Sequence, residues 1–246
     1  MKTPLLLLAA LAAAAGLGAQ SENSRSSYSI TADFTYTSKY VFRGVQLARD
    51  SLQASAEVAV GDPRHGEFYG NLWTNQPFDR GEDDEIDFRV GYRRQVAKGL
   101  SLEALATYYG YPRAGTGATK HTVEGGVGAT FDARGFSPSV YYYYDFNLKA
   151  STVEGAIGYG IPLPAIGTSL DVSVFAGTSQ ADDAKPESGV TVKESYNYYG
   201  ASLEVPYQLS QNTKFRVGAH WATNEKYIAG TPRDRFWVDV GFTAAF

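Results

Sequence analysis

The sequence predicts an all-β fold, a transmembrane antiparallel β-barrel of about 12 strands with short periplasmic turns and longer extracellular loops. Three observations predict it. Apolar and polar residues alternate with period two in segments of roughly ten residues, the connections between these segments alternate between long and short, and an apolar leader precedes the first segment. Mean hydropathy is only −0.27. A barrel hides its membrane signal in this way, because lipid-facing and lumen-facing residues alternate along each strand.

The leader, residues 1–19, has the order of a secretory signal peptide. Lys2 precedes an apolar run from Leu5 to Leu17, and small residues follow, so we expect cleavage after Gly18 or Ala19. The run is shorter than the ~20 residues that a membrane-spanning helix needs. A buried N-terminal helix is the alternative. Residues 20–246 then form one barrel domain, exported to the bacterial outer membrane.

The strands are predicted from the alternation of apolar and polar residues. In the first one, Tyr28, Ile30 and Ala32 share one face, and Ser29 and Thr31 share the other. The predicted strands cover about 28–37, 52–60, 67–75, 85–93, 100–108, 123–131, 136–142, 153–159, 170–176, 199–205, 215–221 and 236–246. Their number is even, as expected for a closed bacterial barrel.

The connections between the strands fall into two classes of length. The long ones cover about 39–51, 75–84, 110–121, 145–150, 178–196 and 223–234. The short ones are 61–66, 97–99, 132–135, 162–168 and 210–213. With both termini in the periplasm, every long connection falls outside the cell and every short one inside, the pattern of a bacterial barrel.

Aromatic residues gather at both ends of the predicted strands. The outer set is Tyr36, Tyr108, Tyr142, Tyr144, Tyr199, Trp221 and Phe236, and the inner set is Phe131, Phe136, Tyr159, Tyr207, Phe215 and Phe246. Two such rings are the girdles expected where amphipathic side chains meet lipid headgroups. The alternative is that aromatics are scattered because they favour β structure.

The last strand ends on Phe246, in phase with Phe242. An aromatic at this position resembles the signal by which the barrel-assembly machinery recognises outer-membrane barrels. We therefore expect Phe242 and Phe246 to act in assembly.

The first long connection carries a family resemblance. It reads Ser38-Lys39-Tyr40-Val41-Phe42-Arg43-Gly44-Val45-Gln46, and the pattern continues through Phe68-Tyr69-Gly70-Asn71-Leu72-Trp73. These segments resemble the TorF family of porins, in which a Tyr-x-Phe-Arg-Gly segment precedes a Gln-containing strand. The resemblance is firmest over the first third of the mature chain. Val45-Gln46 replaces the usual Ser-Gln, and Ser51-Leu52 replaces a Pro-Ala step. The resemblance implies a pore without naming its solute.

The strand phases place charged side chains on the inward face, where they avoid the ~2–4 kcal/mol cost of a basic side chain in lipid. The residues expected to line the lumen and set its selectivity are Lys39, Arg43, Glu57, Glu85, Asp87, Arg89, Arg93, Glu103, Glu124, Glu154, Asp171, Glu204, Arg216, Arg235 and Asp239, together with Asp33 and Glu67. Acids outnumber bases, so we expect a weak preference for cations. The alternative is that these side chains pair with one another and fill a narrow interior.

Two acidic stretches lie in predicted loops. Residues 82–85 form a dense acidic run near the outer rim, and the loop over 178–196 holds further charges. We expect solvated surfaces at both. The alternatives are divalent cations bridging lipopolysaccharide at the first, and a calcium or receptor site at the second.

The sequence does not favour an enzyme. A barrel lipid hydrolase needs a Ser with a nearby His base, yet His65 lies in a predicted turn, His121 in a loop, and His220 has no local Ser partner. No metal site with recognisable spacing is present, and we expect no cofactor. The glycine-rich run 125–128 precedes no helix, so we expect it to pack closely in the barrel wall.

The chain therefore has the features of a channel for small hydrophilic solutes or ions. Its expected partners are outer-membrane lipid, lipopolysaccharide, the barrel-assembly machinery and those solutes. A formal charge of −4 does not favour a nucleic acid. A structural or surface-interaction barrel with a closed lumen is the alternative.

Overall fold

A computed structural model describes residues 28–62, 64–115, 119–181, 195–225 and 233–246. The predicted signal peptide, residues 1–19, and most of the predicted acidic loop 178–196 lie outside the described residues.

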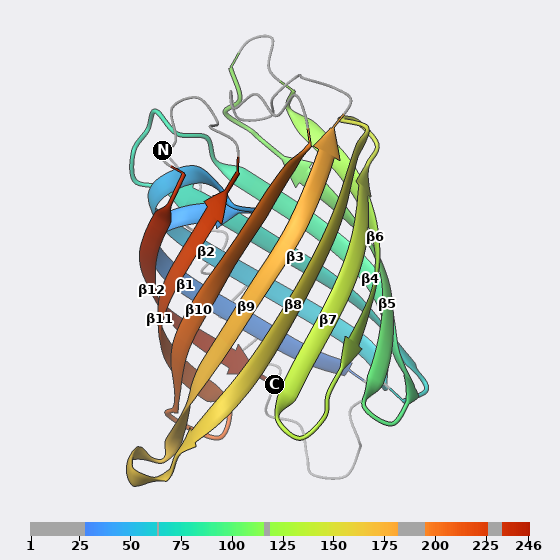
Figure 1. Cartoon of the computed structure of the whole chain (residues 1–246), viewed down its shortest axis with the longest axis vertical. Helices are drawn as coiled ribbons and strands as arrows, with labels where there is room; N and C mark the ends of the chain where they lie inside the picture. Colours follow the sequence, from blue (N-terminus) through green and yellow to red (C-terminus); the bar gives the residue numbers. More distant parts are fainter. Residues whose placement is uncertain (1–27, 63, 116–118, 182–194, 226–232) are drawn as a thin grey trace.

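Twelve antiparallel strands form one closed barrel, which confirms the predicted fold (Figure 1). The strands are β1 (Tyr28–Phe42), β2 (Val45–Asp62), β3 (Gly66–Pro77), β4 (Glu85–Ala97), β5 (Leu100–Gly110), β6 (His121–Phe131), β7 (Phe136–Asp145), β8 (Ala150–Leu163), β9 (Thr168–Ala181), β10 (Tyr196–Gln208), β11 (Thr213–Asn224) and β12 (Arg235–Ala245). Each strand pairs with its sequence neighbours, and β1 closes the barrel on β12 through pairs such as Phe34 with Phe242. Closure gives each strand a neighbour on both sides, so the wall has no edge strand.

The predicted alternation of faces is also confirmed. Large apolar side chains point outward and are exposed, from Phe236 at 68% to Val240 at 36%, whereas Thr107 and Glu124 point inward and are buried. The outward set forms an apolar belt around the barrel: Phe34, Val58, Phe68, Phe88, Val90, Leu102, Val127, Val140, Val153, Ile157, Val174, Leu203, Val217, Val238, Val240 and Phe242. An exposed apolar surface of this extent indicates a membrane or another apolar partner.

Aromatic rings flank the belt, as the sequence predicts. Tyr199, Trp221 and Phe236 form a chain of ring contacts with centroids 5.7 and 6.3 Å apart. At the opposite ends of their strands, the rings of Phe136 and Tyr159 lie 4.5 Å apart. In each girdle, aromatic rings on neighbouring strands are therefore in contact.

The two barrel ends differ in their connections. The short turns after β2, β4, β6, β8 and β10 lie at one end, here called the turn end, and the β8–β9 turn contains the 3-10 helix Pro164–Ile166. Figure 1 shows the β4–β5, β6–β7 and β8–β9 turns together at the bottom of the view. The connections after β3, β5, β7, β9 and β11 lie at the other end, the loop end, and all of them except the one after β7 are longer than the turns. The connection after β7 has only four residues, 146–149, so the prediction of a long connection over 145–150 is wrong. No helix in the described ranges is long and apolar enough to cross a membrane.

The first connection contradicts the prediction of a long loop over 39–51. β1 and β2 continue into this stretch and meet in a two-residue turn, Arg43-Gly44. Both turn residues have positive φ, 47° and 71°, as the tight hairpin turn that matches strand twist requires. A register shift at Tyr40/Val41 interrupts the ladder, and bulges of this kind bend a strand. The extension is therefore an ordered hairpin, and the contacts of its tip lie inside the barrel.

Candidate functional site in the barrel lumen

The tip of the β1–β2 hairpin crosses the lumen near the loop end. The Arg43 guanidinium donates to both carboxylate oxygens of Glu124 on β6, at 2.7 and 2.9 Å. It also lies 4.8 Å from the ring centre of Tyr143 on β7. Only 14% of the Arg43 side chain and 2% of the Glu124 side chain are exposed. The bidentate pair therefore fastens the hairpin tip to the opposite wall.

Backbone and apolar contacts hold the same tip against a second part of the wall. Asn224 on β11 donates its amide to the Gly44 carbonyl at 2.7 Å. A Cβ on Gly44 would lie 2.6 Å from the Cβ of Tyr198 on β10. Val45 is buried against Tyr196 and Tyr198. The hairpin consequently packs on both of its faces and narrows the lumen.

The β3–β4 connection covers the outer part of the hairpin. Glu82 accepts a hydrogen bond from the backbone N–H of Arg49 on β2 at 2.9 Å. Arg113 pairs with Asp84 at 3.0 Å and donates to the Glu82 carbonyl at 2.7 Å. Part of the acidic run 82–85 is therefore engaged in contacts with the protein, rather than being only a solvated rim.

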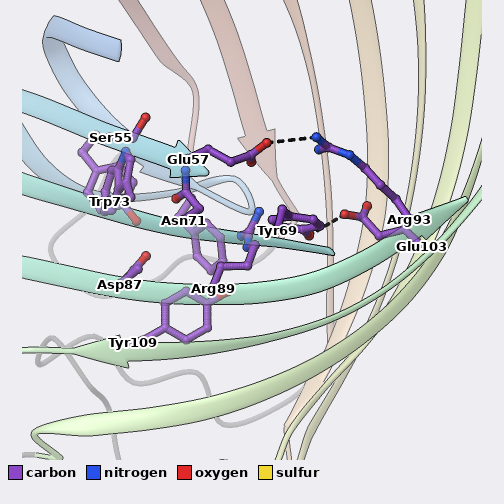
Figure 2. A pocket seen from close by; sticks show the side chains of 12 residues that line it. Ser55, Glu57, Tyr69, Asn71, Trp73, Asp87, Arg89, Arg93, Glu103 and Tyr109 are labelled. Carbon is purple, nitrogen blue, oxygen red and sulfur yellow. Dashed lines mark hydrogen bonds and ion pairs between the residues drawn. The ribbon is translucent and has the colours of Figure 1, made fainter. Parts of the chain in front are cut away.

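A cavity of about 460 Å³ lies beside the hairpin, against the inner face of β2–β5 (Figure 2). Its lining combines aromatic rings with polar and charged side chains: Tyr40, Phe42, Tyr69, Trp73, Tyr109, Ser55, Asn71, Glu57, Asp87, Arg89, Arg93 and Glu103. A smaller cavity of about 160 Å³ shares Tyr40 and Trp73 and adds Trp237. The lumen thus contains space for solute beside the inserted hairpin.

Several predicted lumen charges are paired. Arg93 contacts Glu67 at 2.5 Å and Glu57 at 3.1 Å. Arg216 pairs with Asp33 at 2.6 Å, and its Nε lies 3.7 Å from Asp239. These pairs agree in part with the alternative of an internally paired lumen.

Other predicted acids have hydroxyl partners instead of bases. Glu103 accepts from Tyr141 at 2.6 Å and also from Tyr69. Glu154 accepts from Tyr198 at 2.8 Å. Asp171 accepts from Ser169 at 2.7 Å. Together with Glu204, which faces Asp171 across the β9–β10 ladder, these residues form no ion pair within 4 Å in the described part of the chain. Their negative charge is not offset by such a pair.

The remaining predicted lumen residues lie toward the loop end. Glu85, Asp87 and Arg235 are buried. The Lys39 ammonium donates to the Phe236 carbonyl at 2.7 Å. Strand phase predicts the face on which a side chain lies, but it could not identify the partners of these residues.

His220 corrects the expectation that it has no Ser partner. Its Nδ1 lies 2.8 Å from the Ser202 hydroxyl, and its Nε2 contacts the Asp239 carboxylate. Ser202 lies directly opposite His220 in the β10–β11 ladder, so the partner is 18 positions away in the sequence. The Trp237 ring stacks on the imidazole at 5.0 Å. The three strands therefore align a Ser–His–Asp chain on the lumen wall. His121, predicted in a loop, is the first residue of β6.

The glycines of the 125–128 run do allow close packing in the wall. Cβ atoms on Gly126 and Gly128 would lie 2.7 and 2.2 Å from the rings of Tyr143 and Tyr141. These two tyrosines on β7 stack on each other at 5.6 Å. The glycines thus allow aromatic rings to lie flat on the lumen wall. Across the described ranges, no group of three potential ligands is arranged to hold a metal ion.

Comparison with known proteins begins with one family. Residues 21–165 match the family model described as a bacterial protein of unknown function (Gcw_chp). No curated protein matches the chain.

Solved structures with a similar fold are outer-membrane barrels. An outer membrane channel from Pseudomonas putida F1 aligns with a TM-score of 0.53 and 8% identity, over 93% of this chain and 98% of that one. KdgM porin aligns with a TM-score of 0.52 and 10% identity, over 88% and 99% of the respective chains. LpxR from Salmonella typhimurium aligns with the same TM-score, identity and coverage. At these identities the similarity concerns the fold.

Proposed function

The protein belongs to the Gcw_chp family, whose model matches 21–165, more than half of its 246 residues, and we propose that it forms an outer-membrane channel for small hydrophilic solutes. One observation carries the proposal: a closed barrel with an apolar outside encloses a polar, charged lumen that retains open space. Only a closed barrel satisfies all strand hydrogen bonds in lipid. Lumen-facing polar groups beside such space are what passage of a hydrated solute requires.

The inserted hairpin sets the width of this channel. Its tip is tied to Glu124 and Asn224 on different parts of the wall, so solute passes beside it. The cavity of about 460 Å³ beside the hairpin supports passage of small molecules rather than large polymers.

Weak cation preference is part of the proposal. It is supported by Glu103, Glu154, Asp171 and Glu204, which form no ion pair within 4 Å in the described part of the chain. Charge on a channel wall concentrates counterions over a Debye length of ~10 Å at 0.1 M salt.

Membership of the TorF family of porins and export through the signal peptide remain predictions. The residues that carry the TorF resemblance, Tyr40-x-Phe42-Arg43-Gly44, form the tip of the inserted hairpin. A role in setting channel width would explain why a porin needs this segment.

Swelling of proteoliposomes tests the proposed passage. Vesicles that contain the folded barrel should swell in small neutral solutes, at rates that fall steeply with solute size. Vesicles with heat-unfolded protein serve as the control. Equal rates in the two preparations would instead favour a structural or surface-interaction barrel with a closed lumen.

A second candidate function, ester hydrolysis, is favoured by the Ser202–His220–Asp239 chain. A serine next to a histidine base that a carboxylate orients is the arrangement of an activated nucleophile. Only 8% of the His220 side chain is exposed, and neither cavity described above is lined by Ser202. The geometry therefore supports the channel better. A fluorophosphonate probe separates the two: labelling that Ser202→Ala abolishes would establish the hydrolase.

A further inference from the structure

The larger lumen cavity has an aromatic wall. The rings of Tyr40 and Trp73 lie 5.3 Å apart with their planes inclined by 52°, and Phe42, Tyr69 and Tyr109 complete the aromatic lining. Apolar faces next to a water-filled passage favour a ligand that covers them, by about 25 cal/mol for each Å² removed from water. The wall therefore selects a solute with an apolar face.

A polar side chain whose hydrogen-bond donors are not all used within the protein lies beside this wall. Arg43, Arg93 and Arg216 each pair with a carboxylate. Arg89 donates its Nε–H to Thr107 at 3.1 Å and makes no ion pair within 4 Å among the described residues. Figure 2 shows its guanidinium between Asn71, Tyr69 and Tyr109. Its terminal N–H groups are therefore available to a ligand.

An acceptor lies at another edge of the same cavity. Tyr69 and Tyr141 each donate to a different oxygen of the Glu103 carboxylate. Because a carboxylate has about four lone-pair positions, each oxygen can accept one more hydrogen bond. The two tyrosines fix the carboxylate in place, so it is prepared to receive ligand hydroxyls.

We propose that this cavity binds a saccharide ring. A pyranose has faces of C–H groups and a rim of hydroxyls that both donate and accept. The faces match the aromatic wall, and the rim matches Arg89, Asn71 and Glu103. The cavity volume falls within the ~300–1,000 Å³ of small-molecule sites, enough for one or two rings. This assignment deepens the proposed channel function and rests on it, because the solute reaches the cavity through the barrel.

The test measures saccharide binding directly, independently of any current through the channel. Folded barrel in a detergent without sugar headgroups is titrated by calorimetry and by tryptophan fluorescence. The probes are a glucose disaccharide, galacturonic acid and sorbitol, an open-chain polyol without a ring. We expect saturable binding of at least one ring saccharide and none of sorbitol. Tighter binding of galacturonic acid than of the neutral disaccharide, with the difference lost in Arg89→Gln, would identify the bound form as a sugar acid. Equal binding of the two, weakened to the same extent in that variant, would identify a neutral sugar.

Two tryptophan variants locate the site. Trp73→Ala should weaken binding at least tenfold. Trp237→Ala, a lumen tryptophan that lines only the smaller cavity, should leave it unchanged. Heat-modifiable electrophoretic mobility verifies that both variants are folded, and Tyr69→Phe, which removes one donor to Glu103, replaces Trp73→Ala if that variant fails to fold. Absence of saturable binding, equal binding of sorbitol, or equal losses in the two tryptophan variants would overturn the saccharide site. Binding by a barrel that passes no solute would overturn only the channel, and passage without binding would overturn only the site.

Discussion

At the scale of single residues, the position of a side chain on the inward or outward face decides what it tolerates. Val174 points outward and is 47% exposed, whereas its neighbour Ser173 points inward, opposite Ser202. We expect Val174→Arg to cost ~2–4 kcal/mol in a bilayer, because it exposes a cation to hydrocarbon. Ser173→Arg should be tolerated. Folding yield and heat-modifiable mobility measure the difference. Equal behaviour would mean that the register is wrong, since a shift of one residue exchanges the faces.

Glycine positions give a second contrast at this scale. A Cβ on Gly128 would lie 2.2 Å from the Tyr141 ring, whereas a Cβ on Gly70 would have no atom within 4 Å. We expect Gly128→Ala to destabilise the barrel by about 1–3 kcal/mol, the usual cost of overpacking. Gly70→Ala should be neutral or slightly stabilising, because alanine is less flexible in the unfolded chain. Urea unfolding in lipid vesicles compares the two. A larger loss at Gly70 would contradict this account of the wall.

At the scale of elements, the sequence predicts the strands of the wall well and the inserted hairpin poorly. A wall strand has lipid on one face and lumen on the other, so its composition alternates. The hairpin tip has protein on both faces: Phe42 lies near Tyr109, and Val45 packs on Tyr198. Its apolar residues therefore lose the period of two, and the segment resembles a loop.

The sequence also does not predict which residues on different strands are in contact, for a related reason. Phase placed Glu124 and His220 on the inward face, but the strand pairing and the fold of the hairpin determine which residues they meet. Arg43 reaches Glu124 across 81 positions, and Ser202 meets His220 through the ladder register. A search for Ser beside His within one strand could not find this pair.

The inserted hairpin leads to a prediction about channel conductance. The double variant Arg43→Gln/Glu124→Gln removes the bidentate pair without leaving a buried charge unpaired, which would cost several kcal/mol. We expect a higher and less steady channel conductance, because the tip is no longer fastened to β6. In the control Arg216→Gln/Asp33→Asn, the pair lost lies within the wall, and the change should be much smaller. Equal changes in both would show that the hairpin does not set the width.

At the scale of the whole molecule, the distribution of pairs determines ion selectivity. Among the residues that the structure describes, Glu154 and Glu204 form no ion pair within 4 Å, whereas Glu124 is offset by Arg43. We expect Glu154→Gln/Glu204→Gln to abolish a weak cation preference at low salt. The preference itself should fade at 1 M, where the Debye length falls to ~3 Å. Reversal potentials in a potassium chloride gradient measure both effects. Anion selectivity of the unmodified barrel would contradict this assignment.

The most direct test of the channel is the current through single barrels in a planar lipid bilayer. Purified, folded protein should add discrete conductance steps that grow in proportion to salt concentration at high salt. The double variant at Arg43 and Glu124 should give larger steps of the same kind. A barrel that inserts, as judged by protease protection and heat-modifiable mobility, yet gives no steps in either form would contradict the channel.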